Sequence, residues 1–205
     1  MSISITQATL GLRESDLPGM VLMEEDLASH FDGFSAVREG DLDNRALAEH
    51  GFSGATERRF RDAGRIGGFV REFVSPTAQL DMDGADLIVG SVAHLFDTPD
   101  NVSRWMRDVF LKDFSENVGA VLENGQKMIE VEELKPQGFF DDAVALKTVH
   151  DSSGQIISST VIDFRVGRIL GVAYVATAGN HQRLEEASAL GIAMEKLIVA
   201  AALDG

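Results

Sequence analysis

The sequence predicts an α+β fold: an antiparallel β-sheet of about six strands, flanked by helices and closed by a long C-terminal helix. Three observations lead to this prediction. Six β-rich runs lie between turn signals, short connections join the last four runs, and two stretches have the periodicity of amphipathic helices. Short connections permit only antiparallel neighbours. At 205 residues the chain suits one domain, residues 1–205.

The first two strands are expected at residues 65–75 and 85–96. The second run carries apolar side chains on both faces, with Val89 on one face and Val92 on the other. A strand that is apolar on both faces is buried on both, so this strand should be central in the sheet. Gly90 within it predicts the close approach of another backbone or of a large side chain.

A long amphipathic helix is expected after this strand. Thr98 can cap it, Pro99 fits the first helical position, and Asp100 complements the helix dipole in the first turn. Apolar residues then recur at helical spacing and form one broad stripe. The stripe consists of Val102, Trp105, Met106, Val109, Phe110 and Phe114.

Four short strands and a closing helix should complete the fold. The strands are expected at 128–135, 143–150, 156–165 and 168–177. The closing helix is expected from about His181 to Leu203, with Asn180 as its cap and an unusually wide apolar stripe. Residues 65–205 therefore hold the sheet and two long helices.

Residues 1–64 give a weaker pattern, which predicts a helical and loop region. A short strand is possible at 20–24, and a short helix is expected at 42–50, with Gly51 just beyond its end. Residues 56–63 should form a second helix with a very polar surface.

The composition excludes several classes of partner. The net charge of −15 disfavours nucleic acid and anionic membranes, because both attract basic surfaces. The absence of cysteine excludes disulfides, thiolate metal sites and cysteine nucleophiles. No apolar run reaches the length of about 18 residues typical of a membrane span, so we expect no membrane insertion. The first twelve residues lack the basic and apolar regions of a signal peptide.

No catalytic, metal or cofactor motif is present in the sequence. The five histidines do not have the spacing of metal ligands, and no nucleophile elbow occurs. The acidic stretch 81–86 differs from a calcium loop in the position of its glycine and in the residue at its twelfth position. We therefore expect no catalytic residues, no metal and no cofactor.

The candidate ligand- or partner-binding residues are five arginines, one histidine and one tyrosine. The arginines form the only concentration of positive charge and could hold an anionic ligand or an acidic partner; alternatively, they pair with the chain's own carboxylates. The histidine lies on the predicted buried strand, where a core histidine with satisfied hydrogen bonds is the alternative. The seven residues are Arg58, Arg59, Arg61, Arg65, Arg71, His94 and Tyr174.

Three short segments carry a resemblance to a known fold family. They are Leu17-Pro18-Gly19 after Asp16, the run GRIGGFVREF at 64–73, and Leu95-Phe96-Asp97 leading into the Trp105 helix. Together with the order of elements, they resemble the Mog1/PsbP-like α/β/α sandwich. That type includes bacterial lipoproteins and the extracellular sensor domains of some actinobacterial kinases. The resemblance implies a binding or scaffolding role more than catalysis, and it implies no functional residues. Such sensor domains often carry disulfides, which this chain lacks.

Three functional hypotheses follow. The first is a non-enzymatic binding or sensor module, extracytoplasmic, with a concave site between sheet and helix for an unknown small ligand. It would be secreted or at the cell surface, with a signal peptide that this sequence lacks; otherwise the protein is cytoplasmic. The second is an assembly or partner-binding protein, monomer or homodimer, that uses the arginine-rich segment 58–71 or a sheet edge. The third is a hydrolase-like enzyme with a site assembled from scattered His and Asp/Glu.

Overall fold

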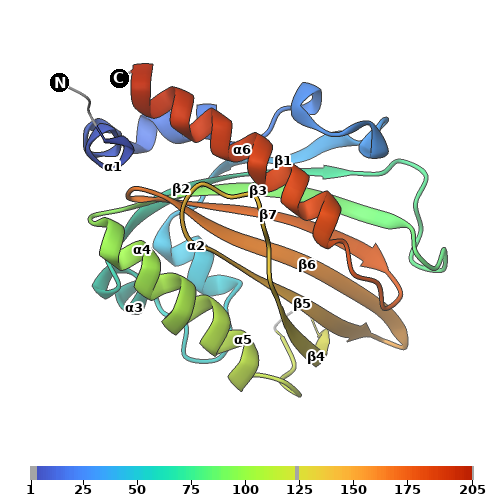
Figure 1. Cartoon of the computed structure of the whole chain (residues 1–205). Coiled ribbons are helices and arrows are strands. Elements are labelled where there is room, and N and C mark those ends of the chain that lie inside the picture. Colours follow the sequence, from blue (N-terminus) through green and yellow to red (C-terminus); the bar gives the residue numbers. More distant parts are fainter. Residues whose placement is uncertain (1–3, 123–124, 205) are drawn as a thin grey trace.

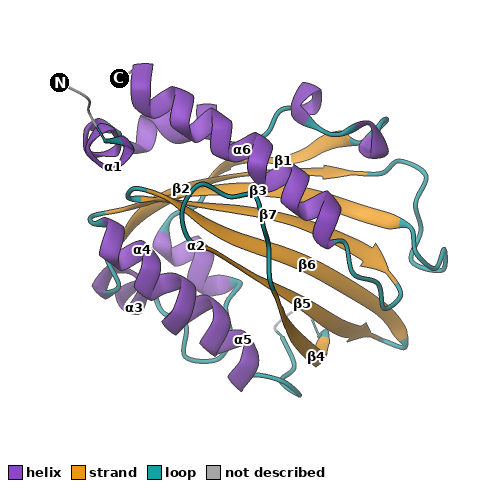
Figure 2. Ribbon diagram, in the orientation of Figure 1, coloured by secondary structure: helices purple, strands orange, loops and turns teal. Residues whose placement is uncertain are grey.

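The structure, a computed structural model, describes residues 4–122 and 125–204. Its centre is one antiparallel sheet with the strand order β1-β2-β3-β7-β6-β5-β4 (Figure 1). Helices cover both faces of this sheet (Figure 2). The predicted α+β class is therefore confirmed. The strands are β1 (Ser35–Asp41), β2 (Arg65–Val74), β3 (Asp86–Phe96), β4 (Lys127–Leu134), β5 (Ala143–Ser152), β6 (Gln155–Val166) and β7 (Ile169–Ala178).

The sheet has seven strands, not the six predicted, and the additional strand is β1. This edge strand pairs only with β2, and its side chains are almost all exposed. Because neither face of β1 enters the core, its sequence has no apolar alternation that would predict a strand. The strand considered at 20–24 does not form: Met20 ends one 3₁₀ helix (Glu14–Met20), Glu24 begins the next (Glu24–Asp26), and Met20 and Leu22 lie in the core.

The predicted amphipathic helix is confirmed. Thr98 accepts a hydrogen bond from the backbone N–H of Asn101, and the helix begins at Pro99. Three segments follow one another without a break, and the middle one is π-helical. They are α4 (Pro99–Trp105), η5 (Met106–Leu111) and α5 (Lys112–Glu116). π-Helical turns are rare and frequently occur at functional sites.

The closing helix α6 (Leu184–Asp204) lies across the opposite face of the sheet (Figure 1). It begins three residues later than expected, so Asn180 does not cap it. The backbone N–H groups of His181 and Arg183 instead donate to hydroxyl groups on β6, those of Ser158 and Thr160. These bonds hold the chain against the sheet before the helix starts.

The N-terminal region divides between the two faces of the sheet. Residues up to Phe31 pack with α6, whereas the later helices lie on the side of α4 and α5 (Figure 1). The first group comprises α1 (Ile5–Ala8), η1 (Thr9–Gly11), η2 (Glu14–Met20), η3 (Glu24–Asp26) and η4 (Ser29–Phe31). The second comprises α2 (Asn44–Glu49) and α3 (Glu57–Asp62), as predicted.

The two faces of the sheet are packed differently. On the α6 face, a large continuous core includes Phe73, Phe164 and Ile198. On the other face the apolar contacts form two smaller clusters, one around Trp105 and one around Val92. The described residues include no helix long and apolar enough to cross a membrane.

Candidate functional site

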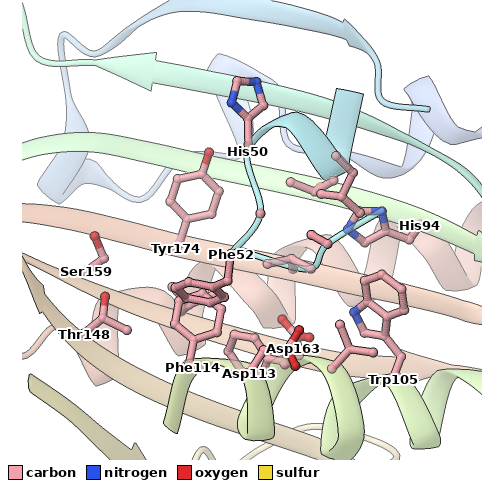
Figure 3. A pocket seen from close by; sticks show the side chains of 18 of the residues that line it. His50, Phe52, His94, Trp105, Asp113, Phe114, Thr148, Ser159, Asp163 and Tyr174 are labelled. Atoms are coloured by element: carbon pink, nitrogen blue, oxygen red, sulfur yellow. The ribbon is translucent and has the colours of Figure 1, made fainter. Parts of the chain in front are cut away.

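The smaller core leaves a cavity of about 420 Å³ between the sheet and the helices α2, α4 and α5 (Figure 3). Its walls come from β3, β5, β6, β7 and the helical layer, and they are mainly apolar. Aromatic side chains dominate the helical side: Phe52, Phe60, Trp105, Phe110 and Phe114, with Tyr174 on the sheet. A concave, mostly apolar cavity with a few polar groups is typical of small-molecule sites.

Asp163 is the most unusual residue of the cavity. It lies on β6 between Ile162 and Phe164, which point into the α6 core, so Asp163 faces the other way. Its cross-strand neighbours are Val144 and Val172. The side chain is 2% exposed and makes no hydrogen bond or ion pair with any described residue. Burial raises the pKa of its carboxyl well above the ordinary value, so the neutral form is favoured.

His94 of β3 lies in the wall of the cavity and is held from behind by Arg65. The guanidinium donates to Nδ1 of His94 from Nε at 3.0 Å and from Nη2 at 2.9 Å. Arg65 also donates to Asn44 Oδ1 and to the carbonyl oxygen of Leu42. Burial, together with the adjacent guanidinium, holds the pKa of His94 well below its usual range.

Trp105 stands between the helical layer and the sheet, and its ring is packed on three sides. It contacts Phe60, Phe96 and His94, with ring centroids between 5.1 and 6.3 Å apart. The indole Nε1 makes no hydrogen bond to the described part of the chain, and in Figure 3 it faces the region of Asp163. Packing of the ring therefore fixes the side chain, whereas the Nε1 donor has no acceptor among the described residues.

His150 of β5 is a further polar residue of the cavity wall. Its Nε2 lies 3.1 Å from Thr148 Oγ1, and its Nδ1 is buried without a hydrogen-bond partner among the described residues. Burial lowers the pKa of this histidine. A buried polar atom without a partner is rare in folded proteins and often marks a functional position.

An ion pair and an aromatic pair border the cavity on the helical side. Arg59 donates two hydrogen bonds to Asp113, at 2.7 and 2.8 Å, so that the two charges cancel. Phe52 packs edge-on against Phe114, with centroids 4.9 Å apart. On the sheet side, the hydroxyl of Tyr174 donates to Glu72, and burial raises the pKa of this hydroxyl well above its ordinary value.

The structure brings only part of the candidate set to one site. His94 and Tyr174 line the cavity, Arg65 lies behind His94, and Arg59 borders the cavity through Asp113. The remaining arginines lie elsewhere, each paired with a carboxylate of this chain: Arg58 with Asp62, Arg61 with Glu57, and Arg71 with Glu39.

Sequence reasoning did not identify Asp163, Trp105 or His150 as site residues. One signal was available for Asp163: it is a lone carboxylate in the apolar run VIDF of the strand predicted at 156–165. Trp105 was assigned to the helix stripe, and its position gives no further indication. Within residues 4–122 and 125–204, no group of three or more His, Asp or Glu side chains could hold a metal ion.

Comparison with known proteins finds a likeness among solved structures. The fold is similar to the crystal structure of the extracellular domain of PknH from Mycobacterium tuberculosis, with a TM-score of 0.61 and 8% sequence identity. The match covers 91% of this chain and 96% of that domain. No protein-family model matches the sequence, and no curated protein is similar to it. At this identity the likeness shows a shared fold.

Proposed function

We propose that this protein is a non-enzymatic binding module that holds a small, mostly apolar ligand in the cavity between the sheet and the α4–α5 helix. One observation carries the proposal. The cavity walls combine aromatic rings with polar groups that have no partner among the described residues, among them the Asp163 carboxyl, the Nε2 of His94 and the Nε1 of Trp105. Unused polar atoms cost stability in an empty protein, whereas a ligand can satisfy them.

Binding is favoured over catalysis by the way the polar groups are arranged. His94 uses Nδ1 for Arg65, and His150, which contacts the hydroxyl of Thr148, has no partner for its other ring nitrogen, Nδ1, among the described residues. A base that activates a nucleophile is in turn oriented by a third group, and His150 lacks one in the described part of the chain. The hydrolase-like alternative therefore has less support from the geometry than the binding module.

The location is part of the same proposal. An extracytoplasmic binding or sensor module of the Mog1/PsbP-like type is consistent with the structural likeness to an extracellular domain. Use of the arginine segment 58–71 by a protein partner has less support, because carboxylates of the chain already engage Arg58, Arg59 and Arg61.

The proposal can be tested through Trp105, which is the only tryptophan in the chain and lines the cavity. Titration with nonane, a simple apolar probe, should change its fluorescence in a saturable way. Val161→Phe, which fills the cavity from β6, should weaken this response at least about tenfold if the added ring occupies the probe's space. Val37→Phe on the exposed edge strand β1 is the matched control and should leave it unchanged. An unchanged titration in Val161→Phe would contradict the assignment of the site.

A further inference from the structure

The proton on His94 can be located from its contact with Arg65. A guanidinium group has only donors, so the Nδ1 that it binds must carry a lone pair. His94 is therefore neutral, with its proton on Nε2. This nitrogen has no protein partner in the described part of the chain, and it is not among the fully buried, unpaired atoms. Since His94 is only 5% exposed and lines the cavity, its Nε2–H opens onto the cavity as a hydrogen-bond donor.

Trp105 supplies a second donor by its chemistry, because an indole nitrogen can only donate. Its Nε1 likewise lacks a partner within the described residues and is not fully enclosed by protein. Both donors are rigid. The indole is held by Phe60 and Phe96, and the imidazole by the guanidinium of Arg65.

Asp163 supplies a third donor while its carboxyl is neutral. Valine side chains flank it on both neighbouring strands, and no cation contacts it. Apolar surroundings can keep a carboxylic acid protonated so that it donates a hydrogen bond. The other titratable groups near the cavity are His94 of β3, His150 of β5, Tyr174 of β7, His50 after α2, Asp113 of α5 and Arg165 of β6. Arg165 is engaged by Asp141 and Ser103.

The charges at the cavity are cancelled within the protein. Asp113 is neutralised by Arg59 through two hydrogen bonds, and the guanidinium of Arg65 is shielded behind His94. Transfer of an unpaired ion from water into such apolar surroundings is strongly unfavourable. An anionic ligand would find no lysine or arginine among the lining residues, and a cationic ligand would first have to deprotonate Asp163.

We infer that the ligand is an uncharged, largely apolar molecule whose polar group is a hydrogen-bond acceptor, such as a ketone or amide carbonyl, directed at Asp163, His94 and Trp105. This inference rests on the proposed function and specifies the ligand class of the same site. The aromatic wall of Phe52, Phe60, Phe110 and Phe114 would cover the apolar body of the ligand.

Four probes with the same carbon chain test the inference: nonane, nonanone, nonylamine and nonanoate, titrated through Trp105 fluorescence and by calorimetry. Nonanone should bind about tenfold more tightly than nonane, a difference of about 1.4 kcal/mol, because its carbonyl oxygen accepts hydrogen bonds from the cavity donors. Nonylamine and nonanoate should bind more weakly than nonanone. Asp163→Leu should remove most of the preference for nonanone over nonane. Asp163→Asn should restore part of this preference through its amide N–H. Trp105→Phe should reduce the preference, which is measured in this variant by calorimetry.

Asp32→Leu is the matched control, because Asp32 is exposed and lies on the other side of the sheet. It should leave all four affinities unchanged. Equal binding of nonane and nonanone would overturn the ligand class but leave the proposed site standing. Tightest binding of nonylamine, lost in Asp163→Asn, would overturn it in favour of a cationic ligand. If none of the four probes binds, both the ligand class and the proposed function are wrong.

Discussion

Arg65 donates two hydrogen bonds to Nδ1 of His94, from Nε at 3.0 Å and from Nη2 at 2.9 Å. Arg65 is itself only 1% exposed. Burial lowers the pKa of this guanidinium to about 10, so it stays charged at neutral pH. A buried cation surrounded by acceptors fixes each of them in one orientation. Arg65 thus determines which ring nitrogen of His94 carries the proton that points to the cavity.

Arg65→Met should destabilise the fold and also alter the cavity. The change leaves Asn44, the Leu42 carbonyl and His94 without their donor, at a cost of about 1–3 kcal/mol for each group that stays unpaired. Urea denaturation should show this loss, and ¹⁵N chemical shifts should show a mixture of His94 tautomers. Arg58→Met removes an exposed ion pair and should cost less than about 1 kcal/mol. Equal effects of the two variants would contradict the role of Arg65.

Asp163→Asn should stabilise the protein in the absence of ligand. The pKa of Asp163 is higher in the folded protein than in the unfolded chain, so folding is most favourable at low pH. This stability is lost as pH rises from the unfolded pKa, near 3.9, toward the raised folded pKa. The amide avoids the loss, so the gain should grow from acidic to neutral pH and reach about 1–3 kcal/mol. Thermal denaturation across this pH range measures it, and a gain independent of pH would contradict a protonated Asp163.

Asp86 should show the opposite pH dependence. Burial acts to raise its pKa, but hydrogen bonds from His30, Thr177 and Arg183 outweigh burial and lower it. The stability that Asp86 contributes is present above its unfolded pKa and is lost as pH falls through the lower folded pKa. Asp86→Asn should cost about 1.5–3 kcal/mol at neutral pH and less in acid, measured by urea denaturation. Asp83→Asn, at an exposed carboxylate, is the control and should have little effect.

Gly90→Ala should destabilise the sheet, because the added Cβ would collide with the ring of Tyr174 on the neighbouring strand. Overpacking of this kind typically costs about 1–3 kcal/mol. The penalty should shrink in a Tyr174→Ala background, which a double-mutant cycle would measure. Gly40→Ala on β1 meets no atom within 4 Å and is the matched control. An unchanged penalty in the double mutant would show that the ring is not the obstacle.

The sequence predicted those elements whose own residues show an apolar pattern or a capping motif. The helix after Thr98 has both a cap and an apolar stripe, and the strand β3 is apolar on both faces; both predictions are confirmed. The expected close approach at Gly90 is confirmed as well, with Tyr174 as the neighbour. In each case local residues are sufficient, because periodicity and capping depend only on near neighbours in the chain.

Elements that depend on distant partners could not be predicted in the same way. The strand β1 exists because β2 offers it an edge, and the late start of α6 depends on hydroxyl groups of β6. The site has the same limitation. The run VIDF marks Asp163 as an unusual carboxylate, but the cavity that it lines forms between the sheet and the helical layer, and the sequence does not reveal how those two layers pack.

The strand β6 has a consequence for how this protein can change. Its odd-numbered residues Val161 and Asp163 face the cavity, whereas Ile162 and Phe164 face the filled core under α6. Substitutions at neighbouring positions should therefore have separable effects, on ligand preference at one and on folding at the next. A deep mutational scan of β6 should show two interleaved tolerance profiles, so that ligand preference could drift during evolution without loss of the scaffold.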